Sequence, residues 1–176
     1  MRTLHNIDLK NNESGFTLRW QDRLILSHTA DAPCLWIGAG EADIEMFRGN
    51  FSIKDKLNEK IALTDATVTQ QSAGWAIRFT RGDAVSATLL VGVDAEGRLE
   101  LKLKNDAASH NRIWLRLAAQ PEDHIYGCGE QFSYFDLRGK PFPLWTSEQG
   151  VGRNKNSYVT WQADCKENAG GDYYWT

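Results

Sequence analysis

Residues 75–104 read WAIRFTRGDAVSATLLVGVDAEGRLELKLK, and the two ends of this stretch decide the fold class. Apolar residues occupy every second position of Trp75–Phe79, and leucines alternate with charged residues along Leu99–Lys104. A period of two places one face of a strand on a core and the other face toward solvent. Turn-forming residues fill Arg81–Asp83 and Asp94–Gly97 between them. The stretch therefore predicts antiparallel strands joined by short turns.

The same alternation recurs outside this stretch. It is found at Phe16–Trp20 and at Ile113–Leu117, and further turn residues stand at Asn11–Gly15, Ser72–Gly74 and Asn105–Asn111. We predict an all-β fold, an antiparallel β-sandwich of two sheets packed face to face. No interior linker or internal repeat divides the chain, so we expect a single domain over residues 1–176.

Evidence for helices is poor, and the best candidate is Ser52–Leu63. Within Ser52–Leu63 the apolar residues Ile53, Leu57 and Ile61 recur every four residues. The segment forms either one or two helical turns or a charged loop that runs into a strand.

The C-terminal part of the sequence also has strand character. Tyr158–Gln162 reads as a strand, and Asp172–Thr176 reads as the beginning of another, with three large aromatic residues at the end of the chain. A sandwich that stops there lacks a partner for its last strand. We therefore expect the sandwich to be truncated at its C-terminal edge.

Composition excludes several classes of function. A net charge of −3 provides no basic surface for nucleic acid, and no apolar run approaches the roughly 20 residues that span a bilayer. The three cysteines, Cys34, Cys128 and Cys165, are odd in number and widely spaced, which predicts neither a disulfide framework nor a zinc site. The N-terminus shows no secretory h-region, so we expect a cytoplasmic protein with reduced thiols.

The four histidines are scattered, with no cysteine or acidic partner at ligand spacing. No serine is accompanied by a positioned base. The sequence therefore predicts no metal, no cofactor and no catalytic residue.

His124–Arg153, HIYGCGEQFSYFDLRGKPFPLWTSEQGVGR, combines conformationally special residues with aromatic and hydrogen-bonding side chains. Gly127 and Gly129 suit backbone positions that need a positive φ or a close approach. Long polar side chains beside flat aromatic rings are what a sugar needs, because its hydroxyls take hydrogen bonds and its C–H face takes a π surface. The alternative is that the aromatic residues are core and the charged ones cap turns.

The same stretch carries motifs that resemble a known family. Tyr126-Gly-Cys-Gly-Glu130 followed by Leu137-Arg-Gly-Lys140 is similar to the pattern in the N-terminal β-sandwich of glycoside hydrolase family 31, the α-glucosidase and α-xylosidase family. Upstream segments fit as well, among them Pro33–Gly38, Met46–Leu57 and Asn111–Gly127. The branch that the chain resembles most cleaves α-sulfoquinovosides.

The resemblance implies a galactose-mutarotase-like sandwich that precedes a (β/α)8 barrel absent from these residues. Such enzymes are retaining, and their two catalytic aspartates lie in the barrel about 5–5.5 Å apart. The resemblance implies a non-catalytic domain that supports this missing barrel, its partner, and contributes to the edge of a sugar-binding pocket. The residues expected at the pocket edge or at the domain interface are Glu130, Gln131, Gln149 and Arg153. The alternative is an independent carbohydrate-binding or protein-interaction module with the same architecture.

Overall fold

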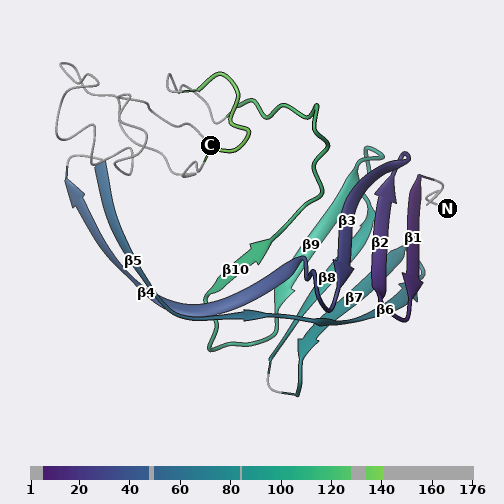
Figure 1. Ribbon diagram of the computed structural model, residues 1–176, viewed down its shortest axis with the longest axis horizontal. Helices are drawn as coiled ribbons and strands as arrows, with labels where there is room; N and C mark the ends of the chain where they lie inside the picture. The colour runs from purple at the N-terminus through teal and green to yellow at the C-terminus, as the bar shows by residue number, and fades with distance from the viewer. Residues whose placement is uncertain (1–5, 48–49, 84, 128–133, 141–176) are drawn as a thin grey trace. The chain divides into compact units, whose positions relative to one another are not determined.

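The computed structural model describes residues 6–47, 50–83, 85–127 and 134–140, and this part of the chain contains strands and no helix (Figure 1). The prediction of an all-β fold is confirmed. The strands are β1 (Ile7–Asn12), β2 (Gly15–Trp20), β3 (Arg23–Thr29), β4 (Leu35–Phe47), β5 (Asn50–Ala62), β6 (Asp65–Gln71), β7 (Gly74–Arg81), β8 (Val85–Val93), β9 (Leu99–Asn105) and β10 (Arg112–Leu115).

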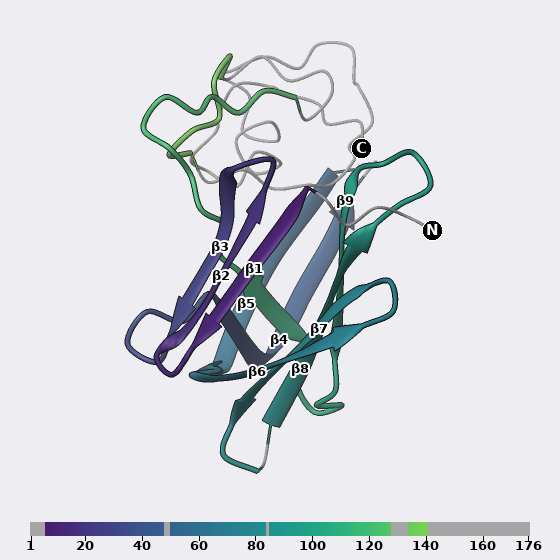
Figure 2. The same cartoon turned by 90° about the vertical axis from the view of Figure 1, so that its right-hand side faces the viewer.

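The described strands form three sheets, with the orders β1-β2-β3, β10-β4-β5 and β6-β7-β8-β9. The first and third are meanders in which neighbours in sequence pair antiparallel, and β10 pairs antiparallel with β4. Figures 1 and 2 both show β1, β2 and β3 lying side by side. The turn between β1 and β2 lies within the predicted Asn11–Gly15, whereas the β2–β3 turn at Gln21–Asp22 was not predicted.

Two details of the sequence prediction were wrong. Ser52–Ala62 lies within strand β5, so the helical alternative is excluded; residues four apart share one face of a strand as well as of a helix, and the spacing alone does not separate the two. Strand β10 ends at Leu115, two residues before the predicted end. Beyond it, the Arg116 amide donates to the Cys34 carbonyl and the Ala118 amide to the Ile25 carbonyl, outside the ladder. The segments Tyr158–Gln162 and Asp172–Thr176 lie outside the described residues.

Alternation along the strands builds the core. In β8 the side chains of Val85, Ala87, Leu89 and Val91 are buried, and those between them are more exposed. Facing residues from the β1-β2-β3 sheet, such as Leu18 and Leu26, and from β4, such as Leu35 and Ile37, join the same cluster. Burial of apolar area of this kind is the main stabilising contribution to such a fold.

A buried histidine sits in this core between two sheets. The His28 ring stacks on Phe16 at 5.5 Å and meets the edge of Phe79 at 5.2 Å. Its Nδ1 accepts a hydrogen bond from the Cys34 amide at 3.3 Å, which leaves Nε2 to donate to the Thr64 carbonyl at 3.1 Å. Both nitrogens of the neutral ring are therefore hydrogen-bonded. Burial lowers the pKa of His28 by more than the hydrogen bond to Thr64 raises it.

Two tryptophans pair across β4 and β10 and hold cations on their faces. Trp36 is the register partner of Trp114. The Lys60 Nζ lies 4.5 Å from the centre of the Trp114 ring and 5.5 Å from that of Trp36, and the Arg116 guanidinium lies 5.4 Å from Trp36. Gly38 leaves room for this arrangement, because a Cβ there would meet the Trp114 ring at 2.8 Å.

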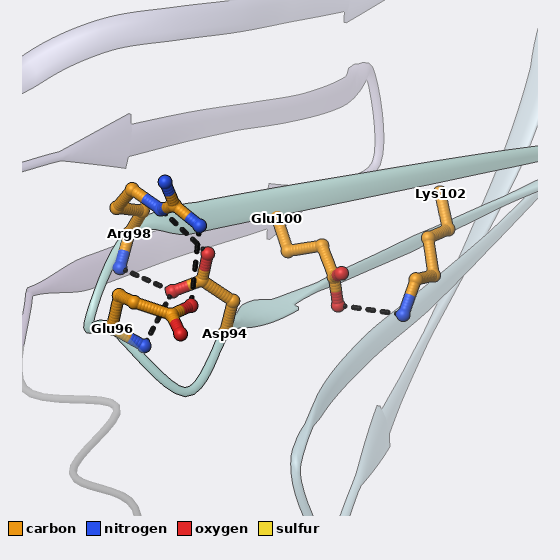
Figure 3. Close-up of polar contacts among 5 residues, drawn as sticks. All are labelled: Asp94, Glu96, Arg98, Glu100 and Lys102. Carbon is orange, nitrogen blue, oxygen red and sulfur yellow. Dashed lines mark hydrogen bonds and ion pairs between the residues drawn. The ribbon is translucent and has the colours of Figure 1, made fainter.

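The β8–β9 turn is organised by one carboxylate (Figure 3). The Asp94 Oδ1 accepts hydrogen bonds from the amides of Glu96 at 3.0 Å and Arg98 at 2.8 Å, while its Oδ2 pairs with the Arg98 Nε at 2.7 Å. These contacts lower the Asp94 pKa, the hydrogen bond from the Arg98 amide most of all. On β9, Lys102 pairs with Glu100 at 2.8 Å. The turn therefore holds β9 in register with β8 through local contacts.

By internal contacts the chain falls into two compact units. One comprises Met1–Gly40 and Leu57–Ala119 and contains the whole core described above; the other comprises Glu41–Lys56 and Gln120–Thr176. That residues 1–176 form a single domain stays a prediction.

Candidate functional site in the loop pair 120–127 and 134–140

The described residues of the His124–Arg153 stretch belong to two loop segments, 120–127 and 134–140, which we call the loop pair. Neither segment is helix or strand, so their conformation depends on side-chain and turn hydrogen bonds. Gly127 and Gly139 have φ values of 121° and 68°, a backbone region that favours glycine. The sequence prediction of a positive φ is confirmed at Gly127, and Gly129 lies outside the described residues.

Asp136 ties the two segments together. Its Oδ2 lies 2.7 Å from the His124 Nδ1, and its Oδ1 accepts hydrogen bonds from the Ile125 amide at 3.1 Å and the Arg138 amide at 3.0 Å. The Leu137 amide adds a bond to the Ile125 carbonyl at 2.8 Å. The hydrogen bond from His124, followed by those from the two amides, lowers the Asp136 pKa to about 2. The carboxylate is therefore charged at neutral pH and fixes the His124 tautomer with the proton on Nδ1.

Arg138 secures the other end of the loop pair. Its guanidinium donates to the backbone carbonyls of Gln120 and Asp123, the latter at 2.8 Å. The Gln120 amide in turn donates to the Asp123 carboxylate at 2.8 Å, and the Asp123 amide to the Gln120 carbonyl at 3.1 Å. Arg138, one of the long polar side chains of the His124–Arg153 stretch, thus stabilises a turn.

Aromatic rings cover the outside of the loop pair. His124 stacks on Tyr126 at 6.0 Å, and Tyr126 contacts Phe135 at 5.1 Å between ring centres. The Lys140 Nζ lies 4.8 Å from the centre of the Tyr134 ring. Phe135 is 88% exposed and Tyr126 is 58% exposed. The alternative in which all these aromatic residues are core is therefore wrong for Tyr126 and Phe135.

The four residues expected at a pocket edge or interface, Glu130, Gln131, Gln149 and Arg153, lie outside the described residues. What the structure adds is the His124–Asp136 pair, which the sequence did not predict because its members are twelve positions apart.

Three histidines have an acidic or cysteine neighbour in space that their spacing in the sequence does not indicate. Besides the His124–Asp136 pair, the His110 Nε2 lies 3.4 Å from the Glu59 Oε2 and the His28 Nδ1 lies 3.6 Å from the Cys34 Sγ. None of these pairs is part of a metal site, because the described residues contain no group of three or more His, Cys, Asp or Glu side chains that could hold a metal ion. The same ranges contain no helix long and apolar enough to cross a membrane.

Comparison with known proteins identifies the class of protein that this fold represents. A model described as the glycosyl hydrolase 31 N-terminal galactose mutarotase-like domain matches residues 9–161. The chain belongs to this family, and the resemblance inferred from Tyr126–Glu130 and Leu137–Lys140 is confirmed.

Individual relatives within the family are sulfoquinovosidases. The chain is 77% identical over 98% of its length to the sulfoquinovosidase of Escherichia coli (strain K12), and 41% identical over 94% of its length to that of Agrobacterium fabrum. A solved structure of a sulfoquinovosidase from E. rectale in complex with an aza-sugar inhibitor superposes with a TM-score of 0.70 at 40% identity over 95% of this chain. The chain spans 26%, 24% and 24% of these three proteins, about a quarter of each.

Proposed function

We propose that this chain acts as the N-terminal, non-catalytic domain of a retaining glycoside hydrolase that cleaves α-sulfoquinovosides. The observation that carries the proposal is 77% identity to the Escherichia coli sulfoquinovosidase over 98% of this chain but only 26% of that enzyme. In this proposal the catalytic aspartates belong to a (β/α)8 barrel in the part of the enzyme that these residues do not match.

The role of the domain is to support that barrel and to form one edge of its sugar-binding pocket. Glu130, Gln131, Gln149 and Arg153 are the residues proposed for the pocket edge or the interface. Glu130 and Gln131 belong to a segment joined at both ends to the loop pair, which the contacts of Asp136 and Arg138 hold together. The fixed loop segments that precede and follow them in the sequence support the proposal, because binding groups need preorganised support.

We further propose that the protein works in the cytoplasm. The free thiol of Cys34 supports a reducing compartment.

The test is a chimera in which this chain replaces the matching quarter of the Escherichia coli enzyme. We expect the chimera to hydrolyse an aryl α-sulfoquinovoside and the separate 176-residue chain to show no turnover above a blank. A folded but inactive chimera, or turnover that copurifies with the separate chain, would contradict the proposal. In the chimera, Gln149→Ala and Arg153→Ala are expected to raise KM more than they lower kcat.

The second candidate function is an independent carbohydrate-binding module, favoured by the exposed rings of Tyr126 and Phe135. Saturable binding of sulfoquinovosides or other glycans to the separate chain by calorimetry, together with an inactive chimera, would establish it in place of the first.

A further inference from the structure

Three apolar side chains of the loop pair are exposed to solvent. Ile125, Tyr126 and Phe135 are 52%, 58% and 88% exposed, and the rings of the last two are in contact. We call these three residues the apolar patch. A Phe that is almost entirely in water loses the stabilisation that burial would provide, and clusters of such residues mark sites of interaction.

The patch is held by a fixed framework. Ile125 is bonded through its amide to Asp136 and through its carbonyl to the Leu137 amide, so the segments on which the patch stands are tied together. Leu137, two residues after the exposed Phe135, is buried, with 6% exposure. An apolar surface that is already ordered costs little conformational entropy when a partner covers it.

The polar groups around the patch favour a protein partner over a sugar. Both oxygens of Asp136 are engaged with His124, Ile125 and Arg138, and the Arg138 guanidinium is engaged with backbone carbonyls. A bound sugar needs side-chain forks directed at its hydroxyls, and the two forks that the structure describes here, Asp136 and Arg138, hold the loop pair together. An apolar surface covering Phe135 would leave this network intact.

We propose that the apolar patch is the surface on which the catalytic part of the enzyme packs, with Phe135 as its central anchor. The occupant follows from chain length: three quarters of each sulfoquinovosidase relative lies outside the region matched here, and that part has to be positioned against this domain. This inference rests on the proposed function and assigns it a specific contact surface.

Hydroxyl-radical footprinting tests the inference by comparing the separate chain with the active chimera described above. We expect oxidation of Phe135 and Tyr126 to slow several-fold in the chimera. Leu90 on β8, which is 40% exposed, serves as the reference and should keep its rate. Buried Leu26 and Phe79 should be protected in both proteins, which verifies that the separate chain is folded.

A second measurement supplies the chain and the remaining three quarters of the Escherichia coli enzyme as separate polypeptides. Phe135→Ala should weaken their association by at least about tenfold, as expected for truncation of a central aromatic anchor. Leu90→Ala is the matched control and should leave the association unchanged.

The outcomes separate the two proposals. An inactive chimera refutes the proposed function. An active chimera in which Phe135 remains as reactive as in the separate chain, or in which Leu90 is protected equally, refutes the apolar patch as the docking surface. Protection of Phe135 in the separate chain on adding a sulfoquinovoside, or on raising the protein concentration, would assign the patch to a sugar or to a second copy and would overturn the inference as well.

Discussion

Gly38→Ala should destabilise the chain, because the position of Gly38 in β4 has no space for a methyl group. A Cβ built there lies 2.4 Å from the Glu59 carbonyl oxygen and 2.8 and 2.9 Å from two carbons of the Trp114 ring. Ordinary contacts begin near 3.4 Å, so the β5 backbone would have to move by about 1 Å. The Trp114 indole would have to shift as well, away from the Lys60 ammonium group that lies over it.

The expected magnitude combines two opposing effects. Overpacking of this kind typically costs about 1–3 kcal/mol in the free energy of unfolding. Loss of glycine's freedom in the unfolded chain offsets about 0.4–1 kcal/mol of that cost. We expect a net loss of about 1–2 kcal/mol, which corresponds to a urea midpoint lower by roughly 0.5–1 M.

The assay is urea unfolding followed by tryptophan fluorescence and by circular dichroism. Gly92→Ala is the matched control, because Gly92 also lies in a strand and its added Cβ meets only the Ala73 carbonyl oxygen, at 3.1 Å. That variant should stay within about 0.5 kcal/mol of the parent chain. Equal midpoints for the two variants would refute the reasoning about close approach at Gly38.

Three further predictions concern titratable groups. For His28, whose pKa burial lowers, the folded ring stays neutral after the unfolded ring has taken up a proton; stability should therefore fall as the pH drops below about 6.5, by at most about 1.4 kcal/mol per pH unit. NMR titration of the His28 ring and urea unfolding at pH 7 and 5 would reveal this, and a flat stability profile would contradict it. For Asp136, the carboxyl NMR shift should titrate near pH 2, so the stabilisation by this carboxylate is present above about pH 4 and is lost as the pH falls toward 2. Asp136→Asn should reduce the hydrogen-exchange protection of the Ile125 amide. An ordinary pKa together with unchanged protection would refute the role of Asp136. For Cys34, buried and with its pKa raised to about 11, a thiol reagent should react only after unfolding; rapid modification of Cys34 in the native chain, mapped by mass spectrometry, would count against this.

The sequence predicted the strands best where alternation was regular. Trp75–Phe79 and Leu99–Lys104 became β7 and β9 because one face of each packs on the core, and the tight turns between the strands were marked by their own residues. Ser52–Leu63 remained ambiguous because a spacing of four is compatible with both helix and strand. Pairing with β4, a contact between segments, made it β5.

The candidate site, like the fold, could be predicted only in part from the sequence. The sequence by itself determined the family, through Tyr126–Glu130 and Leu137–Lys140, because glycines and charged residues at fixed spacing are local information. It also determined the all-β class, because the period of two is a property of neighbouring residues. Only the tertiary structure decided that Asp136 holds His124 and that Arg138 is used within a turn while Phe135 stays in water. The physical reason is that hydrogen bonds and burial depend on which segments meet in space, and no periodicity in the sequence records an encounter between residues twelve or more positions apart.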